Sequence, residues 1–348
     1  MNFNSFCYFL LFSLLCTSST YAQKKQYKVG CIGFYNFENL FDTLDDPDIR
    51  DEEFTPDGSK RWTKSLYQEK LDHMADVVSQ IGTDLTPDGL AILGTAETEN
   101  RKVLEDFAKH PKLRARNYQV VHYDSPDSRG IDVALLYQPK YFTPSHTEAL
   151  RLKIPLDNGD SLTTRDVLLV SGLFDGDSLH VLVNHWPSRR GGELRSRPNR
   201  IRAAMLNLEA VRKIQERDPD ARIVIMGDLN DDPTSPSVKQ ILKAKSKRKK
   251  VASDELYNPM YDFYKKGVGT TAWRDAWSLF DQIIISGTLL QPTDNGYRYY
   301  KAEVFNKSFM TQKIGQFKGY PLRTFVGDSY RGGYSDHFPV YMYMVREL

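Results

Sequence analysis

Cysteine is scarce in this sequence of 348 residues, which contains only Cys7, Cys16 and Cys31. The first two fall in an N-terminal segment that we expect to be removed, so the mature chain would keep one thiol and form no internal disulfide. These cysteines also provide no cluster for a structural zinc ion. The stability of the fold must therefore come from an apolar core, which a chain of this length can supply.

Long hydrophobic runs are also missing. The segment 6–16 is apolar and uncharged, but its 11 residues are fewer than the ~20 needed to span a bilayer. Small residues ending in Ala22 follow it, as in a secretory signal peptide, although no Lys or Arg precedes the run. We therefore expect residues 1–22 to be a cleaved signal peptide and residues 23–348 to form a single secreted or periplasmic domain without a transmembrane segment.

The sequence has no large excess of charge of either sign. Its 47 Lys and Arg residues and 45 Asp and Glu residues give a formal net charge of +2. Nucleic-acid binding would therefore have to depend on local basic clusters. The basic run 243–250 and the acidic run 42–53 are both interpreted as solvent-exposed loops, and the acidic run lacks the central glycine of a calcium-binding loop.

Apolar segments rich in β-branched and aromatic residues are present throughout the chain, with turn residues between them. They predict strands at 29–35, 90–94, 118–123, 133–137, 167–174, 179–184, 223–226, 280–285 and 340–345. Helical spacing predicts amphipathic helices over 67–81 and 201–211, and Asn100 is a good N-cap for a third helix ending at Phe107. This order of elements predicts an α/β domain with mixed sheets.

Polar side chains suited to chemistry follow several of these strands. Strand ends are where α/β folds bring together residues that are distant in sequence. The candidates are Asn36, Glu97, His185, Asp228, Asn230, Asp281, Asp336 and His337.

Three of these residues can supply the oxygen ligands that a hard cation such as Mg²⁺ prefers, namely Asn36, Glu97 and Asp336. Phosphoester hydrolysis also needs a positioned water and stabilisation of the charge that develops on the phosphoryl group. Asp228, with Asn230 beside it, can position and deprotonate that water.

The two histidines can transfer protons or bind phosphate near neutral pH. Asp281 interrupts an apolar strand and should have a buried partner, and His337 is the natural one. His185 and nearby Arg189 can bind phosphate oxygens. Ser335 does not form a hydrolase triad with the two residues after it, because neighbours on an extended chain face opposite ways.

Seven sequence blocks resemble those of the endonuclease/exonuclease/phosphatase superfamily and follow in the same order. Each block is weak alone, but all seven in order are specific. The blocks are Tyr35–Asp42, Gly94–Asn100, Arg129–Tyr137, Asn184–Arg189, Gly227–Asp231, Phe280–Ile283 and Ser335–Val340. The resemblance implies a four-layer α/β/β/α sandwich, with two mixed β-sheets face to face and helices outside.

The resemblance also implies roles for the matching residues. Asn36 and Glu97 would hold the metal, Mg²⁺ or Mn²⁺ in its place, and Asp336 would serve the metal or its waters. His185 would stabilise the phosphate. Asp228 would orient or deprotonate the attacking water, with Asn230 beside it, and Asp281 would pair with His337.

Two further arginines are matched to phosphate contacts. Arg165 looks like the phosphate-contacting arginine of deoxyribonuclease-like members. Arg129 and Asp132 lie in a block whose family role varies, and we consider them as a phosphate-binding residue and a residue that orients His185.

The resemblance leaves three hypotheses for function. The first is a secreted, metal-dependent nuclease that cleaves DNA or RNA, with arginines along the phosphate backbone and tryptophans stacked on bases. The side chains considered for those contacts are Arg189, Arg190, Arg195, Arg197, Arg200, Trp186, Trp273 and Trp277. The second is the same chemistry on an inositol phosphate, a sugar phosphate or a sphingomyelin-type lipid, and the third is a non-catalytic binding module. None implies a protein partner.

Overall fold

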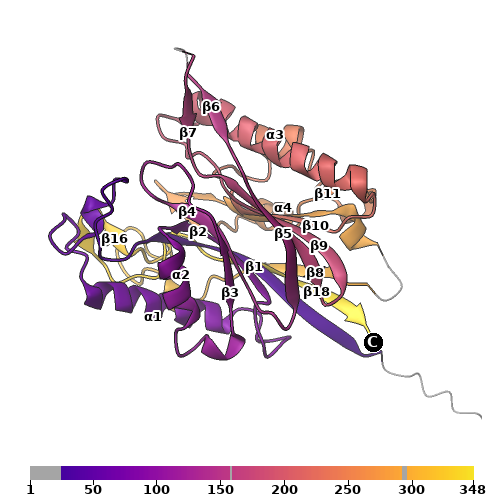
Figure 1. Ribbon diagram of the computed structural model, residues 1–348, viewed down its shortest axis with the longest axis horizontal. Coiled ribbons are helices and arrows are strands. Elements are labelled where there is room, and N and C mark those ends of the chain that lie inside the picture. The colour runs from indigo at the N-terminus through magenta and orange to yellow at the C-terminus, as the bar shows by residue number, and fades with distance from the viewer. Residues whose placement is uncertain (1–24, 157–158, 292–295) are drawn as a thin grey trace, which may run out of the picture.

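Two six-stranded sheets lie face to face in the computed structural model, with helices on their outer sides (Figure 1). The structure describes residues 25–156, 159–291 and 296–348. The expected signal peptide lies outside the described residues. The layers form the α/β/β/α sandwich of mixed sheets that the sequence predicted.

The first sheet has β1 near its centre. In spatial order its strands are β15 (Arg298–Val304), β18 (Val340–Glu347), β1 (Tyr27–Leu40), β2 (Ile92–Thr98), β4 (Asp132–Tyr137) and β3 (Gln119–His122). β1 and β2 are parallel, and the other neighbours are antiparallel. The outer face packs on α1 (Lys64–Gln80) and α2 (Arg101–Ala108) through buried side chains such as Met74 and Phe107.

The second sheet has β10 near its centre. In spatial order its strands are β11 (Leu256–Tyr257), β14 (Asp281–Ser286), β10 (Ile223–Asp228), β9 (Asp177–His185), β8 (Val167–Phe174) and β5 (Phe142–Leu150). β9 and β10 are parallel, and the remaining neighbours are antiparallel. The outer face packs on α3 (Glu193–Arg217) through side chains such as Ala204 and Val211.

Short elements connect the layers. Three small hairpins pair β6 (Lys153–Pro155) with β7 (Ser161–Thr163), β12 (Thr271–Trp273) with β13 (Ala276–Ser278), and β16 (Phe325–Val326) with β17 (Ser329–Tyr330). The short helices are η1 (Glu52–Phe54), η2 (Arg114–Arg116), the π-helical η3 (Ser237–Ile241), η4 (Arg248–Lys250), α4 (Met260–Lys265), η5 (Gly287–Leu290) and η6 (Ser308–Met310). Among the described residues, no helix combines the length and apolarity needed to cross a membrane.

The inner faces of the two sheets form one apolar core that includes Phe34, Val183, Met226 and Ile283. The sheets approach closely at Gly94, where a Cβ atom would lie 2.9 Å from Met226 Sδ and 3.1 Å from Val183 Cγ1. Any larger residue there would force these side chains to shift. Because Gly94 precedes the end of β2 by four residues, this close contact also holds the strand ends of the two sheets near each other.

Candidate active site

Strand register in the second sheet aligns three of the predicted residues in one row. Asp228, the last residue of β10, pairs with His185 on β9 and with Asp281 on β14. Neighbouring residues across strands have Cβ atoms roughly 5 Å apart. The row therefore brings two carboxylates and an imidazole to one edge of the sheet, although they are more than 40 positions apart in sequence.

Strand irregularities in the first sheet place the facing residues. The β1–β2 register shifts between Asn36 and Leu40, and the β2–β4 register shifts between Ala96 and Thr98. Within these bulges Glu38 has φ +49° and Glu97 has φ +59°. A left-handed backbone costs a non-glycine residue roughly 1–2 kcal/mol, and such strain is concentrated at functional sites. The bulges turn the Glu97 side chain towards the second sheet.

The two sheets meet at Asn36. Its Nδ2 donates to Glu97 Oε1 at 3.2 Å and to Asp228 Oδ2 at 3.2 Å, while its Oδ1 accepts from the Glu38 backbone at 2.9 Å. His185 Nε2 lies 3.7 Å from Glu97 Oε1 and 3.6 Å from Asp228 Oδ2. One buried cluster therefore joins residues from β1, β2, β9 and β10.

This cluster offers ligand atoms for a cation. One atom from each of Glu97, His185 and Asp228 lies within 4.8 Å of the other two. Asn36 adjoins this group through its amide nitrogen. Asp336 is not part of the group, since its Oδ2 accepts from Arg323 at 2.5 Å. Of the three ligands predicted from sequence, the group itself contains only Glu97, and the roles of the other two remain predictions.

His337 and Asp281 form the expected pair, with 2.6 Å between Nδ1 and Oδ2. Burial alone would lower the pKa of the His337 imidazole, but the carboxylates of Asp281, Asp228 and Asp336 outweigh it and hold this pKa well above its usual value. His337 Nε2 is 3.9 Å from Asp228 Oδ2. The His337 backbone donates to Ser335 Oγ at 3.0 Å, which fixes the turn. These carboxylates therefore favour the protonated form of His337, which is buried beside Asp228.

Asp228 has the properties of a general base. Its Oδ1 accepts from the Asn230 backbone at 2.9 Å, and Asn230 in turn donates from Nδ2 to the carbonyl of Trp186 at 3.0 Å. Burial raises the pKa of Asp228 to about 7; Asp281 adds to this rise and His337 opposes it. A base is most effective when its pKa lies near the working pH.

His185 differs from His337. Burial, with Arg165 and Arg129 nearby, lowers the pKa of His185 well below its usual value, so the imidazole is neutral at physiological pH. Its buried Nδ1 has no hydrogen-bond partner among the described residues. Asp132, considered as its orienting partner, instead binds His122 Nε2 at 3.0 Å. That interpretation of Asp132 was therefore wrong.

Two of the predicted phosphate-binding arginines converge on one carboxylate. Arg165 is buried and donates to Asp127 at 2.9 Å and to the carbonyl of Trp186 at 2.8 Å. Arg129 is half-exposed, and its Nε lies 3.3 Å from the other oxygen of Asp127. Burial opposes ionisation of Asp127, but the two arginines outweigh it and lower its pKa. Arg165 is therefore held by buried partners, whereas Arg129 faces solvent.

Arg189 supports the loop that follows β10. It donates to the carbonyl of Asn230 at 2.9 Å and to Asp231 and Asp232 at 3.2 Å each, and its guanidinium lies 4.5 Å from the centre of the Phe280 ring. These contacts hold Asn230 in its left-handed conformation with φ +48°. Direct phosphate binding by any of the three arginines remains a prediction.

Most of the arginines proposed to follow a nucleic-acid backbone are already neutralised. Arg200 is fully buried, with Nε 2.7 Å from Asp231 Oδ1, and Arg197 is bound to Glu193 at 2.7 Å. Arg190 and Arg195 are exposed. The first of the three tryptophans, Trp186, is buried and cannot stack on a base, whereas Trp273 is 68% exposed and Trp277 is 37% exposed.

The basic run 243–250 lies far from the site. Lys245 forms a bridge with Tyr257, which pairs with Ile285 on β14. At ~3.4 Å per residue, Ile285 is about 14 Å along the strand from Asp281. This run therefore does not line the active-site edge.

A buried ionic group beside the site was missed from sequence. Lys70 of α1 is fully buried and donates to the carbonyl of Tyr334 at 2.9 Å, and its Nζ lies 4.0 Å from Glu38 Oε2. Arg323 Nε lies 3.5 Å from Glu38 Oε1. Burial raises the pKa of Glu38 to about 7 and lowers that of Lys70 to about 8. The sequence contained one indication that Lys70 is buried, because Lys70 falls within the apolar stripe of its helix, four residues before Met74.

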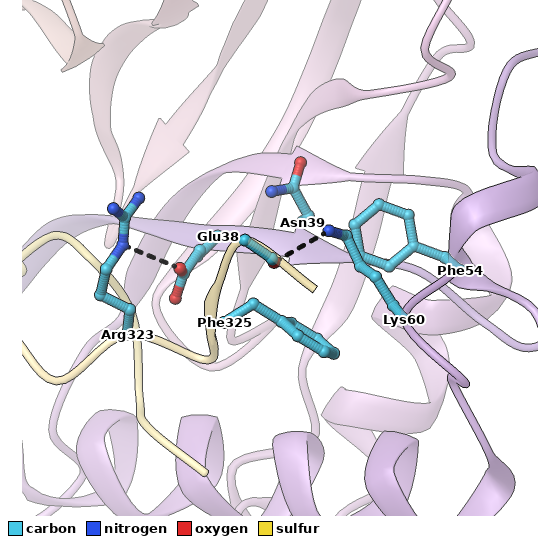
Figure 2. A pocket seen from close by; sticks show the side chains of 7 residues that line it. Glu38, Asn39, Phe54, Lys60, Arg323 and Phe325 are labelled. Carbon is cyan, nitrogen blue, oxygen red and sulfur yellow. Dashed lines mark hydrogen bonds and ion pairs between the residues drawn. The ribbon is translucent and has the colours of Figure 1, made fainter. Parts of the chain in front are cut away.

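A pocket of about 160 Å³ adjoins this ionic group (Figure 2). Its lining residues come from the end of β1, the segment around η1 and the β16–β17 hairpin. They are Glu38, Asn39, Phe54, Lys60, Arg323, Phe325 and Gly327. Asn39 also donates its backbone N–H to Glu97 Oε2 at 3.2 Å, so the pocket shares a wall with the catalytic cluster.

The sandwich fold, with carboxylates and imidazoles at the facing strand ends, defines a site of the phosphoesterase class. The chain belongs to the Endonuclease/Exonuclease/phosphatase family, whose model matches residues 31–346. Members of this family are phosphoesterases and use divalent metals. A search of curated proteins finds no match to this chain.

Solved structures share this fold at low sequence identity. An endonuclease/exonuclease/phosphatase family protein from Bacteroides thetaiotaomicron has 17% identity and a TM-score of 0.53, covering 93% of this chain and 98% of its own. A mannosyl-6-phosphatase from the same species has 16% identity, a TM-score of 0.52 and coverages of 92% and 99%. TDP2 from D. rerio, solved with a single-strand DNA product, has 14% identity, a TM-score of 0.52 and coverages of 91% and 98%.

Proposed function

We propose that this chain is a Mg²⁺-dependent phosphoester hydrolase, with Mn²⁺ as an alternative cation, in which Asp228 activates the attacking water. One observation carries the proposal. Asn36 joins Glu97 to Asp228 across the two sheets at 3.2 Å each, and both His185 and His337 lie within 4 Å of Asp228. Ligand atoms, a base and a proton donor therefore share one buried site.

The residues fit a divalent cation. One ligand atom from each of Glu97, His185 and Asp228 lies within 4.8 Å of the other two, which is the spacing that a single ion needs. Glu97 would hold the ion through its carboxylate oxygens, and we retain Asn36, bonded to Glu97, and Asp336, next to His337, as the proposed further ligands of the ion or its waters. A bound cation would polarise the phosphate and lower the pKa of a bound water.

The chain's own residues account for the proton transfers. Asp228 accepts a proton from water as the water oxygen bonds to phosphorus, and the bond from phosphorus to the leaving oxygen breaks. His337, protonated and held by Asp281, donates its Nε2 proton to the leaving alkoxide. Neutral His185 donates a hydrogen bond to a phosphoryl oxygen. Water is consumed, and an alcohol and a phosphate product are released.

DNA or RNA is one candidate substrate. The β12–β13 hairpin presents the exposed Trp273 and begins next to Thr270, whose hydroxyl accepts from the Asp281 backbone at 3.2 Å. Trp277 of this hairpin stacks on Phe338, beside His337, with ring centres 6.1 Å apart. An aromatic hairpin next to a phosphoesterase site suits a single strand whose bases stack. The D. rerio TDP2 bound to single-strand DNA product shares the fold.

Small phosphate esters are the second candidate, and the pocket beside Glu38 is the observation that favours them. The mannosyl-6-phosphatase that shares the fold acts on such a compound by its name. For either substrate we propose a secreted or periplasmic enzyme, released by cleavage after residue 22.

Hydrolysis of a chromogenic phosphodiester by residues 23–348, with Mg²⁺, with Mn²⁺ and with a chelator, tests the proposal. We expect turnover with either cation and none with the chelator. Single-stranded DNA, RNA and a panel of small phosphate esters then identify the substrate. Absence of turnover on every ester at saturating Mg²⁺ and Mn²⁺ would leave the binding-module hypothesis.

A further inference from the structure

The pocket of about 160 Å³ is bonded directly to the catalytic cluster at two points, and a third contact joins it to Asp336, next to His337. The Glu38 backbone donates to Asn36 Oδ1 at 2.9 Å, and the Asn39 backbone donates to Glu97 Oε2 at 3.2 Å. The Arg323 guanidinium donates to Asp336 Oδ2 at 2.5 Å. A group that enters this pocket would therefore be a close neighbour of a phosphate held at the cluster.

The cations that line the pocket are paired with carboxylates. Lys60 Nζ lies 3.0 Å from Glu53 and 3.6 Å from Asp328. Arg323 is shared between Glu38 and Asp336. Each cation thus has two carboxylate partners, so the pocket has no surplus positive charge to attract a second phosphate. These ion pairs therefore disfavour an anionic group in the pocket.

The lining offers mixed hydrogen-bonding groups. Glu38 presents a carboxylate, Asn39 an amide, and Lys60 and Arg323 present N–H donors, all around one small space (Figure 2). Alternating donors and acceptors suit hydroxyl groups, because each hydroxyl can donate one hydrogen bond and accept two.

The aromatic wall is not a stacking platform. Lys60 Nζ stands 5.1 Å from the centre of the Phe325 ring, while Trp62 and Tyr330 pack against the same ring with centres 5.7 and 5.4 Å away. Phe54 is buried against Phe41. With Phe54 buried and Lys60 over the Phe325 ring, the wall offers little open aromatic surface to a nucleobase, whereas the C–H groups of a saturated ring need only van der Waals contact.

The volume of the pocket also favours a small ring. Pockets that hold drug-sized ligands measure about 300–1,000 Å³, so a pocket of about 160 Å³ holds one small ring. We infer that this pocket binds a neutral polyhydroxylated ring carried by the phosphate ester, and that the substrate of the site is a sugar phosphate or a related cyclic polyol phosphate. This inference rests on the proposed hydrolysis.

A matched pair of monoesters tests the inference. Hexose 6-phosphate and cyclohexylmethyl phosphate have leaving alkoxides of the same kind, and the second carries a six-membered ring without hydroxyls. We expect the wild-type enzyme with Mg²⁺ to prefer the sugar by at least about 100-fold in kcat/KM, since sites built for hydroxyls reject analogues that lack them. A short single-stranded DNA is assayed alongside.

Two variants locate the preference in the pocket. Lys60→Met keeps the aliphatic stem, and Asn39→Gly removes the amide while tolerating the left-handed backbone of φ +56°. Each should reduce the sugar preference by about tenfold or more, mainly through KM. Lys64→Met is the matched control, because Lys64 is exposed and does not line the pocket. If Lys60→Met loses its thermal transition, Asn39→Gly decides the result.

The outcomes separate the two proposals. Equal hydrolysis of both monoesters, preference for DNA, or an unchanged sugar preference in both variants would overturn the polyol pocket and leave phosphoester hydrolysis standing. Failure to hydrolyse any ester with Mg²⁺ or Mn²⁺ would overturn the proposed hydrolysis and, with it, this inference.

Discussion

Individual residues with strained backbone conformations orient the side chains of the active site. Glu38, Glu97 and Asn230 all have left-handed backbones, with φ of +49°, +59° and +48°. Each occupies the point where a strand ends and a side chain must turn towards the opposite sheet. Glu97 and Asn230 could be predicted from the sequence because they follow apolar runs, but a residue type does not reveal φ, so the bulges themselves could not be predicted.

Buried partners were predicted only where a carboxylate interrupts an apolar strand. Asp281 required a partner, and His337 provides it at 2.6 Å. The partners of His185 could not be found in this way, because Asp132 satisfies its charge with His122 on the neighbouring strand. Several histidines and carboxylates compete for each other in such a site, and three-dimensional distance decides between them.

Glu99 gives a prediction for stability against pH. It is 7% exposed, and burial raises its pKa to about 8, with Asp42, Asp51 and Asp46 adding to the rise. The folded pKa is therefore above the unfolded value, so the stability that Glu99 contributes is full below about pH 4.5 and is lost as the pH rises through 8. Glu99→Gln should be more stable than wild type at pH 9 and equal to it at pH 4.

Chemical denaturation in the presence of a chelator measures this effect. We expect the difference in unfolding free energy at pH 9 to reach at least about 1.4 kcal/mol, the equivalent of one pKa unit. Glu52→Gln, at an exposed position in the same acidic segment, is the control. A difference that is independent of pH would contradict the assigned pKa.

At the scale of elements, the structure contains a strand at each of the nine positions predicted from apolar runs, and a helix at each of the three positions predicted from helical spacing or from the Asn100 cap. Within the two large sheets the sequence analysis missed the edge strands β5, β11 and β15: β11 has only two residues, and the other two are partly exposed and carry polar residues that obscure the alternation. It also placed the start of α3 too late, since Pro198 lies within this helix, which begins at Glu193. Local patterns identified every central strand of the two sheets but only one of the four edge strands, β3.

The cap of α2 can be tested directly. Asn100 Oδ1 accepts from the Val103 backbone at 3.1 Å, as predicted from sequence. Asn100→Ala should lower the unfolding free energy by ~1 kcal/mol, because an N–H at the helix start loses its partner. Asn100→Ser retains a capping oxygen and should lose clearly less. Equal losses in thermal or denaturant unfolding of the two variants would show that Asn100 acts through another contact, such as its bond to Asp42.

At the scale of the whole molecule, the layers could be predicted and the distribution of charge could not. Seven blocks in order implied the sandwich, and the family match over residues 31–346 agrees with it. The sequence does not show which charges neutralise each other. The arginines near residue 200 pair with Asp231 and Glu193, and the basic run 243–250 lies at the other end of its sheet. Clusters of like charge in sequence were therefore a poor guide to a binding surface.

The pocket beside Glu38 is likewise a property of the whole chain. Its walls come from β1, the segment around η1 and the β16–β17 hairpin, which are separated by nearly 300 positions. Lys70 holds the hairpin segment against α1 by binding Thr324 Oγ1 and the carbonyl of Tyr334. No single segment carries a motif for the pocket, so only the assembled fold reveals it.

The turnover of Asp228→Asn most directly tests the central claim that Asp228 activates water in a metal-dependent phosphoester hydrolase. The measurement is kcat on a chromogenic phosphodiester at saturating Mg²⁺, with the exposed Asp220→Asn as the control. We predict a loss of at least about 100-fold, as expected for removal of a general base, with an unchanged thermal transition and a normal rate in the control. A kcat within about twofold of wild type would contradict the account.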